Sequence, residues 1–123
     1  MKITAVITEY NPFHNGHLYH LRQARALTGA NAVIVLMSGY FVQRGLPALV
    51  DKYRRAEMAL LAGADAVFEL PTADATASAE GFAGGAVTLL HRLGAVTDLV
   101  YGLSLIHISR ATLVPITSGF RTN

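Results

Sequence analysis

Four short, largely apolar runs, separated by stretches with helical periodicity, constrain the fold of this chain most strongly. The runs span residues 2–8, 32–37, 66–70 and 98–101 and are rich in Val, Ile, Leu and Ala. Strands that are covered on both faces of a sheet have this composition and are typical of parallel sheets. We therefore expect four parallel strands, with helices on both faces of the sheet.

Three helices are expected between these strands, over residues 16–27, 51–62 and 76–93. Apolar residues recur at helical spacing in each stretch, which is the pattern of an amphipathic helix. The third helix contains Gly84 and Gly85, which cost about 1 kcal/mol each relative to Ala in a helix. Start and stop signals flank the first two helices, namely Asp51 as an N-cap and Gly29 and Gly63 as C-terminal stops.

The alternation of strand and helix predicts the fold class. A chain that alternates in this way forms right-handed crossovers and a doubly wound, Rossmann-like α/β sheet. With 123 residues the chain has room for one domain, which we assign to residues 1–102. Residues 103–123 show neither a helical nor a strand period, so we predict no structure for them.

Composition excludes several classes of function. The chain has no cysteine, which rules out disulfide scaffolds, thiolate zinc sites and cysteine nucleophiles. No apolar run approaches the roughly 18 to 20 residues that a membrane span needs, so we expect a cytoplasmic protein without a membrane partner. The net charge of +2 is too small to indicate nucleic-acid binding without a local basic patch.

The segment after the first strand is the first place to look for a ligand site. In doubly wound sheets, ligands bind beyond the carboxyl ends of the strands, and the chain there reads EYNPFHNGH from Glu9 to His17. It places His14 and His17 at the N-terminus of the first helix, whose free N–H groups attract anions. Gly16 allows close approach of the backbone to a ligand, and imidazole N–H groups can stabilise negative charge on phosphate oxygens. The HxGH pattern therefore indicates phosphate chemistry.

Two other interpretations of these histidines are open at this point. They could cap the helix or face solvent, as histidines in loops commonly do. They could also bind a metal together with His20, but six residues of α-helix rotate by roughly 240°, which sets the three rings on different sides of the helix. We therefore expect no metal site.

A second loop, between the second strand and the second helix, offers further candidates. Arg44 lies between Gly39 and Gly45 and could clamp a phosphate or carboxylate, or be an ordinary exposed arginine. A short basic group on the second helix could meet RNA phosphates, although a solvated helix face is the simpler explanation; it consists of Lys52, Arg54 and Arg55. We assign no function to the remaining candidates, which are His91, His107, Asp65 and Glu69.

Longer stretches of the sequence resemble one bacterial family. The blocks are EYNPFHNGHLYHL at 9–21, MSGYFVQRG at 37–45, PALVDK at 47–52 and FELP at 68–71. They are similar to the bacterial tRNA-Met cytidine acetate ligase family, and the similarity covers residues 1–102. The N-terminal part of this family resembles nucleotidylyltransferases of the HIGH superfamily, which share the HxGH signature.

The resemblance implies a reaction in two steps. ATP activates acetate as acetyl-adenylate with loss of pyrophosphate, and the acetyl group then passes to N4 of the wobble cytidine of elongator tRNA-Met. Acetate itself attacks the α-phosphate, so the protein positions reactants and stabilises charge without a nucleophile of its own. The implied partners are ATP, acetate and tRNA-Met, and Mg²⁺ is expected to neutralise the phosphates of ATP.

Carried over position by position, the resemblance implies that His14 and His17 act on the phosphates. On chemical grounds we add Arg44 as a catalytic contact to phosphate or acetate. No metal-ligating residue is implied. The implied ATP-binding residues are Ile7, Thr8, Glu9, Tyr10, Asn11, Pro12, Phe13, His14, Asn15, Gly16, His17, Leu18, Tyr19, His20 and Gly102.

After Gly102 the chain departs from the family pattern, which continues with Ser-Glu and a much longer region that completes the nucleotide site and binds tRNA. We expect residues 103–123 to be a non-native tail from a truncated or frame-shifted reading frame, so that the sheet is incomplete and the activity belongs to the parent enzyme. Two alternatives are another HxGH nucleotidylyltransferase, acting on a small phosphorylated metabolite, and a non-catalytic nucleotide-binding fragment. A requirement for acetate separates the ligase from both.

Overall fold

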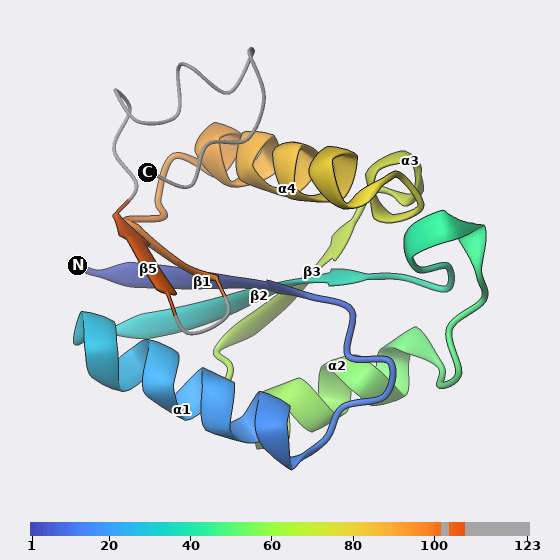
Figure 1. Ribbon diagram of the computed structural model, residues 1–123. Coiled ribbons are helices and arrows are strands. Elements are labelled where there is room, and N and C mark those ends of the chain that lie inside the picture. The colour runs from blue at the N-terminus through green and yellow to red at the C-terminus, as the bar shows by residue number, and fades with distance from the viewer. Residues whose placement is uncertain (102–103, 108–123) are drawn as a thin grey trace.

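Five strands form one sheet in the computed structural model, which describes residues 1–101 and 104–107 (Figure 1). The strand order is β3-β2-β1-β4-β5; the first four strands are parallel and β5 is antiparallel to β4. The predicted doubly wound parallel sheet is confirmed. In chain order the elements are β1 (Ile3–Thr8), α1 (Asn15–Thr28), β2 (Ala32–Ser38), the 3₁₀ helix η1 (Gln43–Gly45), α2 (Lys52–Leu61), β3 (Ala66–Leu70), α3 (Thr72–Ala75), α4 (Ala79–Leu93), β4 (Asp98–Tyr101) and β5 (Ser104–His107).

Helices cover both faces of the sheet: α1 and α2 lie on one face, and α3 and α4 lie on the other (Figure 1). Successive side chains of a strand point to opposite faces, so each central strand contributes to two separate cores. In β1, Ala5 packs in the core beneath α4, whereas Val6 packs in the core beneath α1 and α2. Both residues are fully buried, which explains why the strand is apolar at successive positions.

The strand order places a topological switch point beside β1. The chain leaves β1 for α1 on one face of the sheet, whereas the neighbouring strand β4 is reached from α4 on the opposite face. The carboxyl ends of β1 and β2 lie level with each other, because Thr8 is paired with Met37 in the register. The segments after these two strands therefore meet at the edge of the sheet where doubly wound proteins bind ligands.

Capping residues set the helix boundaries as predicted. Asp51 is the N-cap of α2, and its Oδ1 accepts a hydrogen bond from the Tyr53 N–H at 2.7 Å. Gly29 ends α1 in the left-handed conformation with φ 63°, and Gly63 follows α2 with φ 114°. Glycine adopts these positive φ values without the strain that a Cβ would cause.

The helix expected over 76–93 is shorter than predicted, and the separate turn α3 precedes it. Helix α4 begins at Ala79, directly after Ser78, whose side chain caps it. The two helices meet at Gly85, where an added Cβ would lie 2.7 Å from Cβ of Asp74. A helical glycine that looked only like a weak point in the sequence is therefore the place where α3 approaches α4.

Strand β5 lies in the region for which we predicted no structure. It pairs antiparallel with β4, with Leu99 opposite Ile106 and Val100 opposite Leu105. Formation of β5 depends on pairing with the edge of β4, not on an alternation of apolar and polar residues within its own four residues. A prediction from local periodicity therefore misses it.

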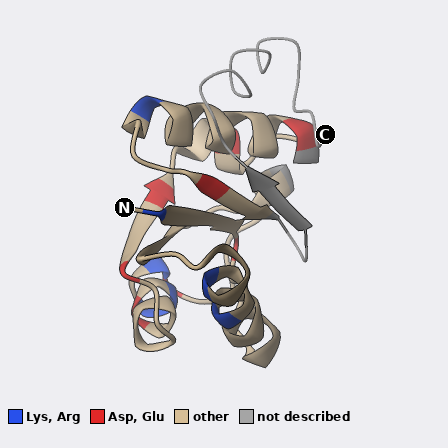
Figure 2. Ribbon diagram, turned by 90° about the vertical axis from the view of Figure 1, so that its left-hand side faces the viewer, with Lys and Arg blue, Asp and Glu red and all other residues tan. Residues whose placement is uncertain are grey.

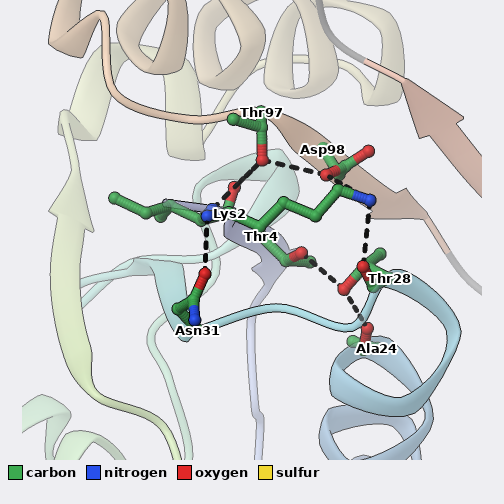
Figure 3. Close-up of polar contacts among 8 residues, drawn as sticks. Lys2, Thr4, Ala24, Thr28, Asn31, Thr97 and Asp98 are labelled. Carbon is green, nitrogen blue, oxygen red and sulfur yellow. Dashed lines mark hydrogen bonds and ion pairs between the residues drawn. The ribbon is translucent and has the colours of Figure 1, made fainter.

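The amino-terminal edge of the sheet, opposite the predicted site, is held by a polar network (Figure 3). Nζ of Lys2 lies 3.9 Å from Oδ2 of the buried Asp98 and donates to the Thr28 carbonyl at 3.0 Å. Oγ1 of Thr4 donates to Oγ1 of Thr28 at 2.7 Å, and Oγ1 of Thr97 donates to Asp98 Oδ2 at 2.9 Å. These contacts join β1, β4 and the end of α1, so we interpret them as structural.

Positive charge is distributed unevenly over the two helical layers. Figure 2 shows Lys and Arg on α1 and α2, on one face of the sheet, whereas α4 carries Arg92 near its C-terminal end. Within residues 1–101 and 104–107, no helix combines the length and the apolar character that crossing a membrane requires.

Candidate functional site

The segment between β1 and α1 carries six of the fifteen predicted ATP-binding residues, Glu9 to His14, and Tyr10 anchors it. The Tyr10 side chain is 1% exposed, and its ring lies edge-on to those of Phe13 and His17, with centroids 4.8 Å apart in each pair. Its φ of 50° is unusual for a residue with a bulky side chain and is maintained by the surrounding packing. Burial raises the pKa of the Tyr10 phenol. Tyr10 is therefore a neutral support beneath the histidines.

His14 and His17 cap the first turn of α1 reciprocally. His14 is the N-cap residue, and its Nδ1 accepts a hydrogen bond from the Gly16 N–H at 3.0 Å. The His14 N–H in turn donates to Nδ1 of His17 at 3.1 Å. This is the arrangement of a capping box with imidazoles in place of the usual hydroxyl and carboxylate. The interpretation of the histidines as helix caps is therefore correct, and it is compatible with a ligand site.

The two caps determine which ring nitrogen is the donor. In a neutral imidazole one nitrogen carries the proton and the other accepts. Because Nδ1 accepts a backbone N–H in both His14 and His17, the proton of each neutral ring lies on Nε2. Each ring therefore has an Nε2–H donor next to the N-terminal turn of α1, where backbone N–H groups and the helix dipole favour an anion.

Burial and neighbouring charges favour the neutral form of the His17 ring. The His14 and His17 rings stack with centroids 3.8 Å apart and planes inclined by 25°. The pKa of His17 is lowered, first by burial and then by the charges of His14 and His20. Near neutral pH, His17 is therefore a neutral hydrogen-bond donor, and a bound anion would favour its protonated form.

The loop after β2 forms the second wall of the site. Oε2 of Glu9 accepts a hydrogen bond from the Gln43 N–H at 2.8 Å, and Oδ1 of Asn11 accepts from the Leu49 N–H at 2.7 Å. These bonds tie the segment after β1 to the loop that contains η1. Arg44 lies within η1, so its backbone is part of this loop, and its predicted contact with phosphate or acetate stays a prediction.

Arg55 is a correction to the sequence analysis, which placed it in a basic group on a solvated helix face. Its side chain is fully buried. The guanidinium donates from Nη1 to the carbonyls of Glu9 at 2.7 Å and Ser38 at 3.0 Å, from Nε to the carbonyl of Val50 at 2.8 Å, and from Nη2 to the carbonyl of Gly39. Periodicity could not reveal this role, because the partners come from the loops after β1 and β2.

Lys52 also differs from the solvated residue that we expected. Its Nζ lies 2.6 Å from Oε1 of Glu69 and 4.4 Å from the centroid of the Tyr40 ring. The hydrogen bond to Glu69 is the main reason that the pKa of Lys52 is raised. The pair borders a cavity of about 190 Å³ at the carboxyl ends of β2 and β3. Because Lys52 already forms an ion pair with Glu69, it is a poor candidate for binding RNA phosphates.

The other predicted ATP-binding residues do not all face one place. Ile7 contributes to the core beneath α4, whereas Tyr19 is 57% exposed on α1 and His20 has an Nε2 that is buried without a hydrogen-bond partner. Residues 15–20 turn around α1 through more than one full turn, so one ligand could not contact all of their side chains. Gly102 lies outside the described residues.

Asp65, to which we assigned no function, is part of a structural contact at the amino-terminal edge. Its Oδ2 accepts from the Val33 N–H at 2.7 Å and from Nη2 of Arg25 at 2.6 Å. The bond from Val33, followed by the one from Arg25, lowers the pKa of the Asp65 carboxyl. These contacts hold the starts of β2 and β3 against α1, away from the histidine pair.

Comparison with known proteins connects this geometry to a family. Residues 1–113 match the family model described as HIGH Nucleotidyl Transferase. The tRNA(Met) cytidine acetate ligase of Thermosipho melanesiensis is 59% identical over 102 residues, which are 83% of this chain and 24% of the relative. The protein of the same name from Clostridium kluyveri is 52% identical over 114 residues, which are 93% of this chain and 28% of the relative.

Solved structures agree with these matches. The crystal structure of Thermotoga maritima TmcAL bound with alpha-thio ATP aligns with a TM-score of 0.78 and 56% sequence identity, and the alignment covers 80% of this chain and 24% of that one. The apo form of the same protein aligns with a TM-score of 0.77. The chain thus spans about a quarter of the length of the relatives it matches. With the HxGH segment, the strand order and these matches in agreement, the chain belongs to the HIGH Nucleotidyl Transferase family.

Proposed function

We propose that this chain provides the ATP-binding part of a ligase that uses acetate to acetylate a cytidine of tRNA-Met. The observation that carries the proposal is the reciprocal capping of α1 by His14 and His17, which leaves an Nε2–H donor on each neutral ring beside the first turn of the helix, at the carboxyl edge of the sheet. A triphosphate needs this combination of donors and helix dipole. The ATP analogue in the T. maritima structure and the name of the curated relatives support the choice of nucleotide and of reaction.

The proposed chemistry needs no nucleophile from the protein. An acetate oxygen attacks the α-phosphorus of ATP, the bond from that phosphorus to the bridging oxygen breaks, and pyrophosphate leaves. The N4 amine of the cytidine then attacks the acetyl carbonyl, loses a proton, and AMP leaves. His14 and His17 would donate to oxygens on which negative charge increases in the first step, and the segment 9–17, tied to the loop after β2 by Glu9 and Asn11, would orient the phosphates.

The remaining parts of the proposal follow from this assignment. Arg44 and Gly102 would contact the nucleotide or acetate, and a tRNA substrate places the enzyme in the cytoplasm. Mg²⁺ enters only as a counter-ion of the ATP phosphates. Among the described residues, no group of three or more His, Cys, Asp or Glu side chains is placed to hold a metal ion, and we derive no step through one.

Acetate-dependent exchange of labelled pyrophosphate into ATP tests the proposal. It should be measured for this chain and for an extended protein, in which residues 1–101 continue into the downstream part of the T. melanesiensis relative. Acetate-dependent exchange by the extended protein supports the ligase. Acetate-dependent exchange by both proteins would mean that this chain carries the whole half-reaction. Absence of acetate-dependent exchange from both would refute the ligase and favour an adenylyltransferase for a small phosphorylated metabolite.

A further inference from the structure

One buried guanidinium connects the segments after β1 and β2, which both border the candidate site, with the start of α2. Arg55 reaches the segment after β1 through the Glu9 carbonyl, the loop after β2 through the carbonyls of Ser38 and Gly39, and the start of α2 through the Val50 carbonyl. Its side chain is 0% exposed. Burying a cation in this way is costly unless its donors are satisfied, so four backbone acceptors converging on one side chain define the arrangement of the loops.

The cation also determines the direction of the backbone dipoles at this edge. In a planar trans peptide the C=O and the following N–H point in opposite directions. The carbonyls of Glu9, Ser38 and Gly39 point toward Arg55. The N–H groups that follow them, which belong to Tyr10, Gly39 and Tyr40, therefore point away from it. The carbonyl oxygens that would repel a triphosphate are thereby engaged inside the protein.

Side-chain bonds reinforce the same junction between the two loops. Glu9 accepts from Gln43 and Asn11 accepts from Leu49, at 2.8 and 2.7 Å. Burial lowers the pKa of Arg55, and the carboxylates of Asp51, Glu9 and Glu69 partly offset this by favouring its charged form. Arg55 and these two bonds thus form a continuous bridge between the segment that carries His14 and the loop that carries η1.

We propose that Arg55 is a positioning residue of the nucleotide site, which holds the loops after β1 and β2 in one arrangement so that the 9–17 segment is preformed for the triphosphate. It acts through the backbone and does not touch the reacting atoms. The inference rests on the proposed function only in so far as segment 9–17 binds ATP. Without Arg55 the loops would sample other arrangements, and ATP would bind only to the fraction that is correctly ordered.

The test uses the extended protein with three variants. Arg55→Met removes the charge and all donors, Arg55→Lys keeps the charge but not the planar fork of donors, and Arg54→Met is the matched control on the exposed neighbour. For each, the KM values for ATP and acetate, the kcat of exchange, the Kd for ATP by calorimetry and the thermal midpoint are measured. We expect Arg55→Met to raise the Kd and the KM for ATP by about tenfold, which corresponds to correctly ordered loops in about one molecule in ten. The KM for acetate should stay within twofold, Arg55→Lys should show an intermediate effect, and Arg54→Met should show none.

A purely structural role gives a different pattern. If Arg55 only stabilises the fold, its loss lowers the thermal midpoint, and at a temperature well below that midpoint the KM and Kd for ATP equal the wild-type values; that result overturns the inference. If Arg55→Met does not fold, the ATP affinity of Arg55→Lys decides in the same way. Wild-type protein that binds ATP without acetate-dependent exchange would refute the ligase, and the Kd comparison would still decide the role of Arg55.

Discussion

The imidazole rings of His14 and His17 stack at the first turn of α1, with centroids 3.8 Å apart, and each accepts a backbone hydrogen bond at Nδ1. The pair therefore caps the helix, fixes the tautomer of both rings, and lowers the pKa of His17 through the neighbouring charge of His14. A hydroxyl or carboxylate cap would perform the first of these alone. The pairing explains why imidazoles stand at two capping positions where smaller polar residues are the usual choice.

Substitutions that keep the caps should separate catalysis from folding. His14→Asn retains a good N-cap acceptor, and His17→Gln retains the reciprocal bond of a capping box, but both remove the Nε2–H donor. We expect either change to slow ATP–pyrophosphate exchange by the extended protein by about 100-fold or more, with a thermal midpoint within a few degrees of wild type.

The control is His91→Gln, at the C-terminal end of α4, which should leave the exchange rate unchanged. Exchange at the wild-type rate in both His14→Asn and His17→Gln would mean that the histidines are caps and nothing more.

The titration of His17 should reflect its neighbours. Its pKa is lowered by burial and by His14 and His20, so its NMR titration midpoint should lie below the ordinary value of about 6.5. His14→Asn removes one of these charges and should raise the midpoint, whereas His91→Gln should not move it. If the midpoint is the same in wild type and His14→Asn, the coupling between the two rings is absent.

The same shift makes a prediction about stability. Below about pH 6.5 the unfolded chain protonates His17 more readily than the folded protein does. The unfolded state then binds more protons, so the contribution of His17 to the free energy of unfolding decreases as the pH falls through this range. Urea denaturation of wild type and His17→Gln at pH 8 and pH 5 checks this, because the variant should lose less stability on acidification.

The glycine pair in α4 should give opposite results on substitution. Nothing lies within 4 Å of a Cβ built on Gly84, whereas one on Gly85 would meet Cβ of Asp74 at 2.7 Å. Gly84→Ala should raise the free energy of unfolding by up to about 1 kcal/mol through helix propensity. Gly85→Ala should lower it by about 1–3 kcal/mol by separating α3 from α4. Denaturant unfolding measures both, and equal effects of the two substitutions would contradict the predicted contact.

Asp65→Ala should destabilise the fold in a manner that depends on pH. The variant leaves the Val33 N–H without its acceptor and removes the contact with Arg25; because the carboxylate is half exposed, we expect a loss of about 1 kcal/mol at pH 7. The pKa of Asp65 is lowered in the folded protein, so its contribution is present above about pH 3.9 and is lost as the pH falls through the folded value.

Denaturation of wild type and variant at pH 7 and pH 2.5 measures this difference, which should shrink in acid. Glu57→Gln on α2 serves as the control. A difference between wild type and Asp65→Ala that is the same at both pH values would show that the carboxylate charge plays no part.

Local sequence patterns predict the elements well but their partners poorly. The four parallel strands and helices α1 and α2 were recognisable because burial on both faces and helical spacing are properties of neighbouring residues. The separate turn α3 and strand β5 were not, since α3 lies against α4 where Asp74 approaches Gly85 and β5 depends on pairing with β4. The histidine segment was found because its signature is contiguous and follows a strand.

The sequence by itself determined the order along the chain of the four parallel strands and the main helices between them, and the position of the HxGH segment at the end of β1, because periodicity and capping act over a few residues. Only the tertiary structure decided what the charges of α2 do. Arg55 is buried against four carbonyls and Lys52, one turn earlier, pairs with Glu69, yet both look like surface cations in the sequence. Their partners come from loops and strands that are remote in the chain, and the parallel sheet brings them together at one edge.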